Sequence, residues 1–162
     1  MFRTQFLREM QPGEEPAVDA LLRAAFGQAD EARIVTALRR EGRIAGECIV
    51  PGDDGPVGYF ALSAMRAPDG WLCLAPVAVA PEAQGQGVGR RMIGMLSAWT
   101  VAAGQTVVVL GEPGFYERCG FSVARARNLT SPYPVAHTAL ARPGQDAPTA
   151  TLTYPKALSP AS

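Results

Sequence analysis

The sequence predicts an α+β fold, in which a mixed, mostly antiparallel sheet of six to seven strands is flanked by about four helices. Three apolar runs within residues 45–80 are separated by turn sequences at 51–55 and 68–70, which indicates an antiparallel meander. The last of these runs, a long helical pattern and another apolar run then form a strand–helix–strand unit, which requires a parallel pair of strands. The 162 residues suit one domain, 1–162, with a frayed tail after about residue 156.

The N-terminal quarter is expected to form one strand and two helices. Residues 2–9 form the predicted strand, and a break at Pro12-Gly13 follows it. Apolar residues then recur at helical spacing until Gly27, a typical residue for a helix end. Asp30 is expected to cap a second helix that ends at Gly42 and buries Ile34, Val35 and Leu38.

The fourth strand is predicted to be irregular. Residues 71–80 are almost wholly apolar, as in a strand that is buried on both faces. Pro76 stands in the middle of this run, where it cannot donate a ladder hydrogen bond. We therefore expect a bulge or a local splay near Pro76.

The second half of the chain carries the clearest helix, residues 87–103, which Gly104 ends. Its expected buried face consists of Val88, Met92, Met95, Leu96 and Trp99. The strand that follows covers 106–110. Beyond it we expect a short helix at 112–118, a strand at 120–127, a long strand at 135–142 and an edge strand at 149–154.

Composition excludes several classes of protein. Acidic and basic residues are equal in number, so neither nucleic acid nor a membrane surface is an expected partner. No signal core or membrane-length apolar run occurs, which makes a cytoplasmic location the default expectation. The widely spaced Cys48, Cys73 and Cys119 and the single histidine, His137, fit neither a disulfide framework nor a metal site. We expect no metal, and either a monomer or a homodimer.

A glycine-rich turn joins the fourth strand to the long helix. Gly85, Gly87 and Gly89 allow positive φ and a close approach of a ligand to the backbone. The free N–H groups and the dipole of the helix start favour a phosphate or pyrophosphate there. No Gly-Lys-Ser/Thr sequence ends the turn, and its glycine spacing differs from G-x-G-x-x-G, so neither a P-loop nor a dinucleotide fingerprint is present.

Two segments resemble signatures of the GNAT acetyltransferase family. One is Gln84-Gly85-Gln86-Gly87-Val88-Gly89, similar to Q/R-x-x-G-x-G/A. The other is Phe115-Tyr116-Glu117-Arg118-Cys119-Gly120-Phe121, similar to F-Y-x-x-x-G-F. The strong likeness covers about residues 57–125 and points to a small bacterial subgroup of single-domain members. It implies a GNAT acyl-CoA N-acyltransferase fold, with a sheet that splays after its fourth strand.

The resemblance also implies acetyl-CoA as co-substrate and an amine as acceptor. The pyrophosphate would lie on the backbone of the glycine turn, with Arg90 or Arg91 assisting, and the pantetheine would pair with the fourth strand. The implied cofactor-binding residues are Val77, Ala78, Val79, Gln84, Gly85, Gln86, Gly87, Val88, Gly89, Arg90 and Phe115. The acceptor is unassigned, and its expected surroundings are the first two helices, the loop after the second strand and residues 132–137.

Tyr116 is the implied general acid, because a protonated phenol can donate to the departing thiolate; the alternative is that it only positions the cofactor. Glu112 is the candidate general base or, alternatively, a helix cap. The backbone N–H of Val79 or of a neighbour is the expected oxyanion donor. Cys73 or Cys119 as a nucleophile is a further alternative to direct attack in a ternary complex. A non-catalytic acyl-CoA sensor and an acyltransferase with a longer acyl donor also remain open.

Overall fold

The computed structural model of the chain describes residues 5–160. Within this range the main sheet has six strands in the order β1-β2-β3-β4-β5-β7, and β4 and β5 pair in parallel, whereas the other neighbours pair antiparallel. The strands are β1 Arg8–Glu9, β2 Ile44–Val50, β3 Gly58–Ala64, β4 Leu72–Val79, β5 Val107–Leu110 and β7 Thr138–Ala141. The α-helices are α1 Glu15–Phe26, α2 Asp30–Arg40, α3 Val88–Ala102 and α4 Pro113–Arg118. The predicted fold class is therefore confirmed.

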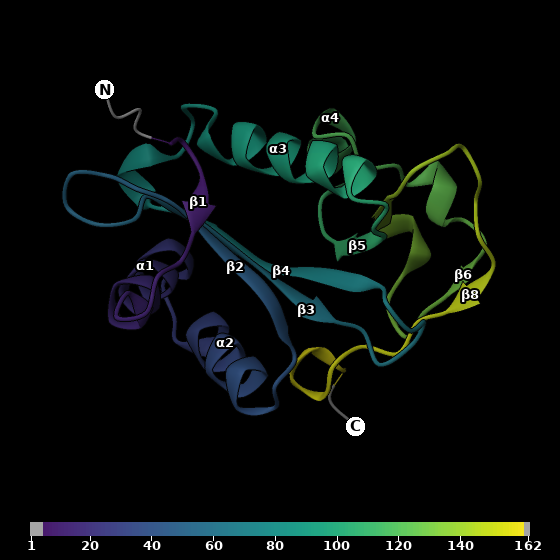
Figure 1. Ribbon diagram of the computed structural model, residues 1–162, viewed down its shortest axis with the longest axis horizontal. Helices are drawn as coiled ribbons and strands as arrows, with labels where there is room; N and C mark the ends of the chain where they lie inside the picture. The colour runs from purple at the N-terminus through teal and green to yellow at the C-terminus, as the bar shows by residue number, and fades with distance from the viewer. Residues whose placement is uncertain (1–4, 161–162) are drawn as a thin grey trace.

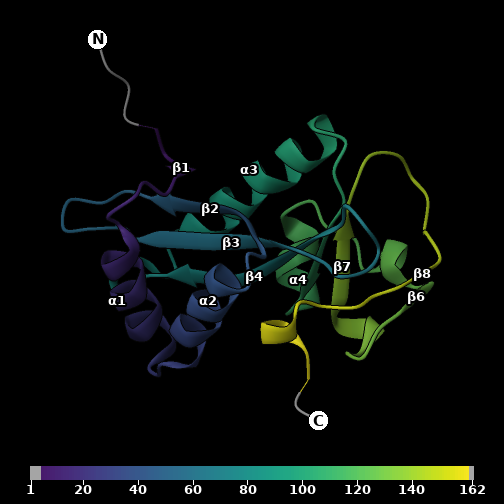
Figure 2. The same ribbon diagram turned by 60° about the horizontal axis from the view of Figure 1, so that its bottom comes forward.

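The helices cover opposite faces of the sheet. Figures 1 and 2 show α3 and α4 on one side and α1 and α2 on the other. Successive side chains of a strand point to opposite faces of the sheet and therefore pack into two different hydrophobic cores. Phe60 packs with Met92 and Leu96 under α3, whereas Tyr59 packs with Val18 and other residues under α1 and α2.

A buried ionic group ties α2 to the sheet. Arg39 of α2 donates to the Glu47 carboxylate of β2 through both Nε and Nη2, and Nη2 lies 2.7 Å from Oε1. The fully buried Tyr59 donates to the same oxygen at 2.6 Å. A carboxylate removed from solvent needs such partners, so Glu47 has a structural role here.

The predicted bulge near Pro76 is confirmed. Phe60 of β3 pairs with Val77, but Leu62 pairs with Leu74, so Ala75 and Pro76 together face the single residue between them. The parallel pairing of β4 with β5 covers only Leu72–Leu74. Beyond the bulge, β4 pairs with β3 alone among the described strands, and its other edge is open.

Several predicted boundaries are wrong at the N-terminal end. The described part of the 2–9 strand pairs only at Arg8 and Glu9, and residues 2–4 lie outside the described residues. Phe6 lies before the strand, where its ring packs under the Arg91 guanidinium, whose Cζ is 4.0 Å from the ring centroid. Asp30 is the first residue of α2 rather than its cap, which is Ala29, and Ala32 replaces Ile34 on the buried face.

The predicted burial of Met95 and Trp99 is also wrong. Their side chains are 43% and 47% exposed, whereas Met92 and Leu96 of the same helix are buried. The helical spacing places all four on one broad stripe, but the sheet below α3 ends at the short strand β1. Among residues 5–160, no strand therefore covers the outer part of the stripe.

The strand predicted at 120–127 is a single bridge followed by a 3₁₀ turn, Ala124–Ala126. Ser122 exchanges two hydrogen bonds with Leu140, and its hydroxyl then accepts from the backbone N–H of Arg125. The Arg125 guanidinium donates to the backbone oxygens of Arg142, Pro143 and Asp146. These contacts hold the segment in a turn.

The strand predicted at 135–142 is shorter than expected. It covers only β7, because Pro134 starts the 3₁₀ turn Val135–His137. The segment predicted as an edge strand at 149–154 pairs with β6, Leu129–Thr130, through β8, Ala150–Thr151, and not with the main sheet. The chain then folds back into the 3₁₀ turn Lys156–Leu158, which contacts α2.

Candidate functional site

The glycine turn adopts the backbone conformation that its residues allow. Gly85 and Gly87 have φ of +78° and +82°, values that side chains with a Cβ rarely adopt. The first helical hydrogen bond of α3 runs from the N–H of Arg91 to the oxygen of Gly87. The N–H groups of Val88, Gly89 and Arg90 are therefore left without a helical acceptor at the positive end of the helix dipole.

A groove of about 270 Å³ opens over this turn and the free part of β4. It contains most of the residues predicted to bind the cofactor. Its lining consists of Val77, Val79, Ala83, Gln84, Gly85, Gly87, Val88, Gly89, Arg90 and Phe115.

Two predicted binding residues, Ala78 and Gln86, do not line the groove. The Ala78 side chain is buried on the α1 and α2 face. Gln86 is exposed, and its side-chain amide donates to the Glu82 oxygen at 3.2 Å. Ala83 joins the lining instead, because the 3₁₀ turn Pro81–Ala83 folds it back under the glycine turn.

The open edge of β4 presents the backbone groups of Val77 and Val79. The backbone N–H of Ala80 donates to the Val57 oxygen at 2.8 Å. Every second residue of an antiparallel strand bonds to the same neighbouring strand, so Ala78 bonds to β3 as well. Val77 and Val79 then point their N–H and C=O groups away from β3, towards the groove. In agreement, the side-chain amide of Gln84 donates to the Val79 oxygen at 3.0 Å.

The two candidate arginines are separated by the fold. Arg90 lines the groove, whereas the guanidinium of Arg91 lies over Phe6. Gly89 lies at the floor of the groove, where an added Cβ would be 3.4 Å from Val79 and 3.6 Å from Phe115. The site thus combines anion-binding N–H groups, one guanidinium and a free strand edge.

Tyr116 is half-buried beside the groove. Its ring packs edge-to-face on Phe115 and Phe121, at centroid distances of 5.0 Å and 5.9 Å. Its ring also lies so close to Gly111 that a Cβ there would be 2.5 Å from it. Burial, and secondly the nearby Cys119 and Cys73, raise the pKa of Tyr116 to about 12, which keeps the phenol protonated.

Glu112 forms the N-cap of α4. Its side chain accepts a hydrogen bond from the N–H of Phe115 at 3.0 Å. This bond, followed by those from Gly114 and the charges of Arg118 and His137, lowers the pKa of Glu112 below its usual value. The cap, one of the two predicted alternatives, is therefore present, and the lowered pKa makes the carboxylate a weaker base.

The cysteines do not resemble activated nucleophiles. Cys73 and Cys119 are buried, and desolvation raises the pKa of both thiols, that of Cys73 to about 12. His137, in the turn before β7, accepts from Gly111 N–H through its backbone oxygen at 3.0 Å. Within residues 5–160, no group of three or more potential metal ligands occurs, and no helix has the length and apolarity needed to cross a membrane.

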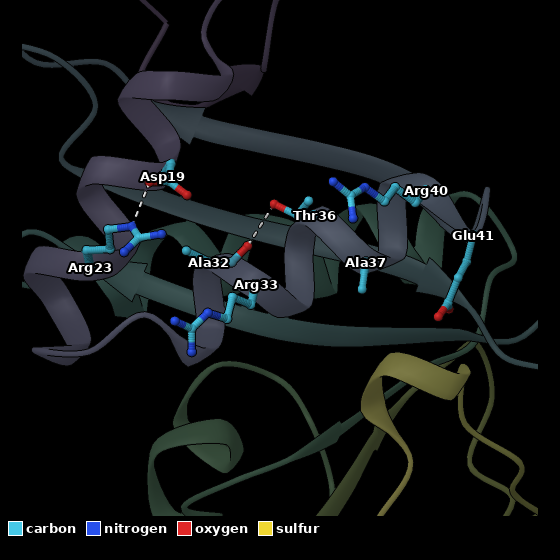
Figure 3. Close-up of a pocket in the computed structure, with 8 residues that line it drawn as sticks. All are labelled: Asp19, Arg23, Ala32, Arg33, Thr36, Ala37, Arg40 and Glu41. Atoms are coloured by element: carbon cyan, nitrogen blue, oxygen red, sulfur yellow. Dashed lines mark hydrogen bonds and ion pairs between the residues drawn. The ribbon is translucent and has the colours of Figure 1, made fainter.

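Two larger grooves of about 400 Å³ each contain none of the predicted cofactor residues. The first, shown in Figure 3, lies between α1 and α2 and is mostly charged. There Arg23 pairs with Asp19 at 2.8 Å. The second lies between α3 and the free edge of the sheet.

Comparisons with known proteins agree with this geometry. The acetyltransferase (GNAT) domain family matches residues 30–123. The uncharacterized N-acetyltransferase YhbS of Escherichia coli (strain K12) is 34% identical over 136 residues, 79% of this chain and 80% of its own length. The chain therefore belongs to the GNAT acetyltransferase family.

Solved structures show the same relationship. The crystal structure of YhbS from Escherichia coli in complex with CoA is 30% identical, with a TM-score of 0.82 over 93% of this chain and 89% of its own. A GNAT family acetyltransferase from Brucella melitensis in complex with acetyl-CoA is 27% identical. It has a TM-score of 0.77 over 94% of this chain and 97% of its own.

Proposed function

We propose that the protein transfers an acetyl group from acetyl-CoA to a primary amine of a small molecule or peptide, by direct attack in a ternary complex. The observation that carries this proposal is the single groove that joins the N–H groups of the glycine turn to the open edge of β4. Similar structures with CoA and acetyl-CoA bound support the choice of co-substrate.

The pyrophosphate binds at the start of α3. The free N–H groups from Gly85 to Arg90 and the helix dipole stabilise its negative charge. The Arg90 guanidinium lies in the same groove and supplies a positive charge. Positive φ at Gly85 and Gly87 leaves these N–H groups uncovered by side chains.

The pantetheine arm then extends along β4 as an added strand would. Its amides pair with the outward N–H and C=O groups of Val77 and Val79. The Gln84 amide now bonded to the Val79 oxygen gives up or shares that acceptor when the arm is present. The bulge at Pro76 keeps β5 from closing this edge.

The reaction needs a neutral amine, a donor to the tetrahedral oxyanion and a proton for the thiolate. An outward backbone N–H of β4, from Val79 or Val77, is the oxyanion donor. The C–N bond forms in the tetrahedral intermediate, and Tyr116 then donates its phenol proton to the sulfur as the C–S bond breaks. Its raised pKa weakens it as an acid but keeps it protonated at every physiological pH.

The amine loses its proton to Glu112 or to water. As a cap, Glu112 also fixes the start of the helix that carries Tyr116. A carboxylate of lowered pKa is a weak base, so the attacking amine must be neutral before the reaction or transfer its proton late.

Release of free thiol from acetyl-CoA across a panel of primary amines tests the proposal. We expect release that depends on at least one amine, together with an N-acetylated product of matching mass. Tight CoA binding without thiol release for any amine would instead indicate a sensor. Thiol release only from longer acyl-CoA donors would reject acetyl-CoA as the natural donor.

A further inference from the structure

The groove between α3 and the free edge of the sheet has the size of a small-molecule site. Its volume is about 400 Å³, within the range of roughly 300–1,000 Å³ found for ligand pockets. Residues from β1, β2, β3 and α3 surround it. They are Leu7, Arg8, Glu9, Ala45, Gly46, Cys48, Phe60, Leu62, Met95, Leu96 and Trp99.

Apolar side chains form its floor and one wall. Phe60 and Leu62 are buried below it, whereas Met95 and Trp99 of α3 are 43% and 47% exposed above it. An exposed indole and thioether that flank a recess offer a ligand both apolar area and an aromatic face. The wall is therefore suited to a flat or branched apolar group.

The groove is open because β1 is short. Arg8 and Glu9 pair with Ile49 and Cys48, and a register irregularity in β2 follows between Ile44 and Gly46. Among residues 5–160, no strand pairs with the outer edge of β2 at Ala45 and Gly46. The end of the groove therefore reaches solvent at the edge of the sheet.

A carboxylate stands at the rim of this apolar recess. Glu9 lies directly across from Cys48, so both side chains are on the groove face. Burial, and secondly the Glu9 charge, raise the pKa of the Cys48 thiol to about 11. Within the described chain Glu9 forms no ion pair, whereas the neighbouring Arg8 is bound to Glu14 through two hydrogen bonds of 2.8 Å.

We infer that this groove binds a small amphiphilic amine, whose apolar body lies between the sheet and α3, against the Trp99 ring, and whose ammonium group pairs with the Glu9 carboxylate at the rim. Charge complementarity selects a cation because, among residues 5–160, Arg8 is already paired with Glu14, whereas Glu9 has no ion-pair partner. The Trp99 ring contacts the apolar body, which a charged and an uncharged ligand of the same shape share. The groove shares no lining residue with the groove over the glycine turn, so the two sites can be occupied together.

Calorimetric titration of the full chain with phenethylammonium, in the presence of saturating CoA, tests this inference. We expect saturable binding at one site. 2-Phenylethanol, which has nearly the same shape and no charge, should bind about five-fold more weakly, and phenylacetate more weakly still. Glu9→Gln should weaken phenethylammonium to the level of the alcohol, and Trp99→Ala should weaken both ligands.

Val101→Ala is the matched control, because Val101 is a 50% exposed residue of the same helix outside the groove. It should leave binding unchanged. Equal affinity for amine and alcohol, or binding that neither Glu9→Gln nor Trp99→Ala weakens, would overturn the inference. Dimerisation that increases with concentration and is lost in Trp99→Ala would also overturn it, since a second copy would then occupy the groove. The outcome does not depend on acetyl transfer.

Discussion

Replacing Gly89 by alanine should separate cofactor binding from stability. An alanine Cβ would lie 3.4 Å from Val79 and 3.6 Å from Phe115, distances of ordinary contact, so the helix can accept it. Alanine also favours the helical state over glycine by up to about 1 kcal/mol. Gly89→Ala should therefore be as stable as the parent protein or slightly more stable.

The same methyl group occupies the floor of the groove where the pyrophosphate must approach the backbone. Loss of one hydrogen bond to a charged group costs about 1.5–3 kcal/mol. That cost raises the Kd for CoA by about 10- to 150-fold. Calorimetric titration with CoA and a thermal melt of the same sample measure both effects.

Gly94→Ala is the control on the same helix, because a Cβ at Gly94 would meet nothing within 4 Å. We expect about 1 kcal/mol of added stability, a rise in Tm of roughly 2–4 °C, and an unchanged Kd for CoA. If Gly89→Ala binds CoA as tightly as Gly94→Ala does, the pyrophosphate does not lie on this turn and the reasoning is refuted.

Three further predictions concern single side chains. Tyr116→Phe should lower turnover by about 100-fold or more with CoA affinity unchanged, and turnover near the parent value would show that the phenol proton is not used. Tyr59→Phe should cost about 1.5–3 kcal/mol in urea unfolding, because Glu47 loses a 2.6 Å hydrogen bond in a buried place; a cost below about 0.5 kcal/mol would contradict this. The hydrogen bond from Arg8, first among the causes, lowers the pKa of Glu14 from 4.5 to about 2. The free energy of unfolding that ionised Glu14 contributes is therefore present in full above about pH 4.5 and is lost as the pH falls towards about 2. Over that pH range, Glu14→Gln should lose less free energy of unfolding than the parent protein does.

Local signals were sufficient for the part of the fold that holds the site. Pro76 has no backbone N–H to donate to a neighbouring strand, so its place in an apolar run is enough to predict the bulge. Gly27 ends α1 in the left-handed conformation, and Gly85 and Gly87 have the positive φ that their spacing indicates. The bulge and the glycine turn were thus predictable from local sequence, whereas the resemblance to the GNAT family implied the binding residues, nine of eleven of which line the groove.

Elsewhere, contacts distant in the sequence decided the structure. The 120–127 segment has strand-like residues, but Arg125 binds carbonyl groups about twenty residues further along the chain. The exposure of Met95 and Trp99 depends on how far β1 extends, which the helix sequence does not encode. The Ala78 side chain points to the face under α1 and α2 because Ala78 pairs with Tyr59. This register depends on both strands and not on the sequence of β4 alone.

A crystal structure of the protein with acetyl-CoA tests the central claim most directly. The account predicts the pyrophosphate on the N–H groups of residues 85–90, the pantetheine amides paired with Val77 and Val79, and the thioester sulfur within hydrogen-bonding reach of the Tyr116 hydroxyl. Acetyl-CoA bound elsewhere, for example in the charged groove between α1 and α2, would contradict it. Acetyl-CoA on the glycine turn with its sulfur far from Tyr116 would contradict the proposed general acid.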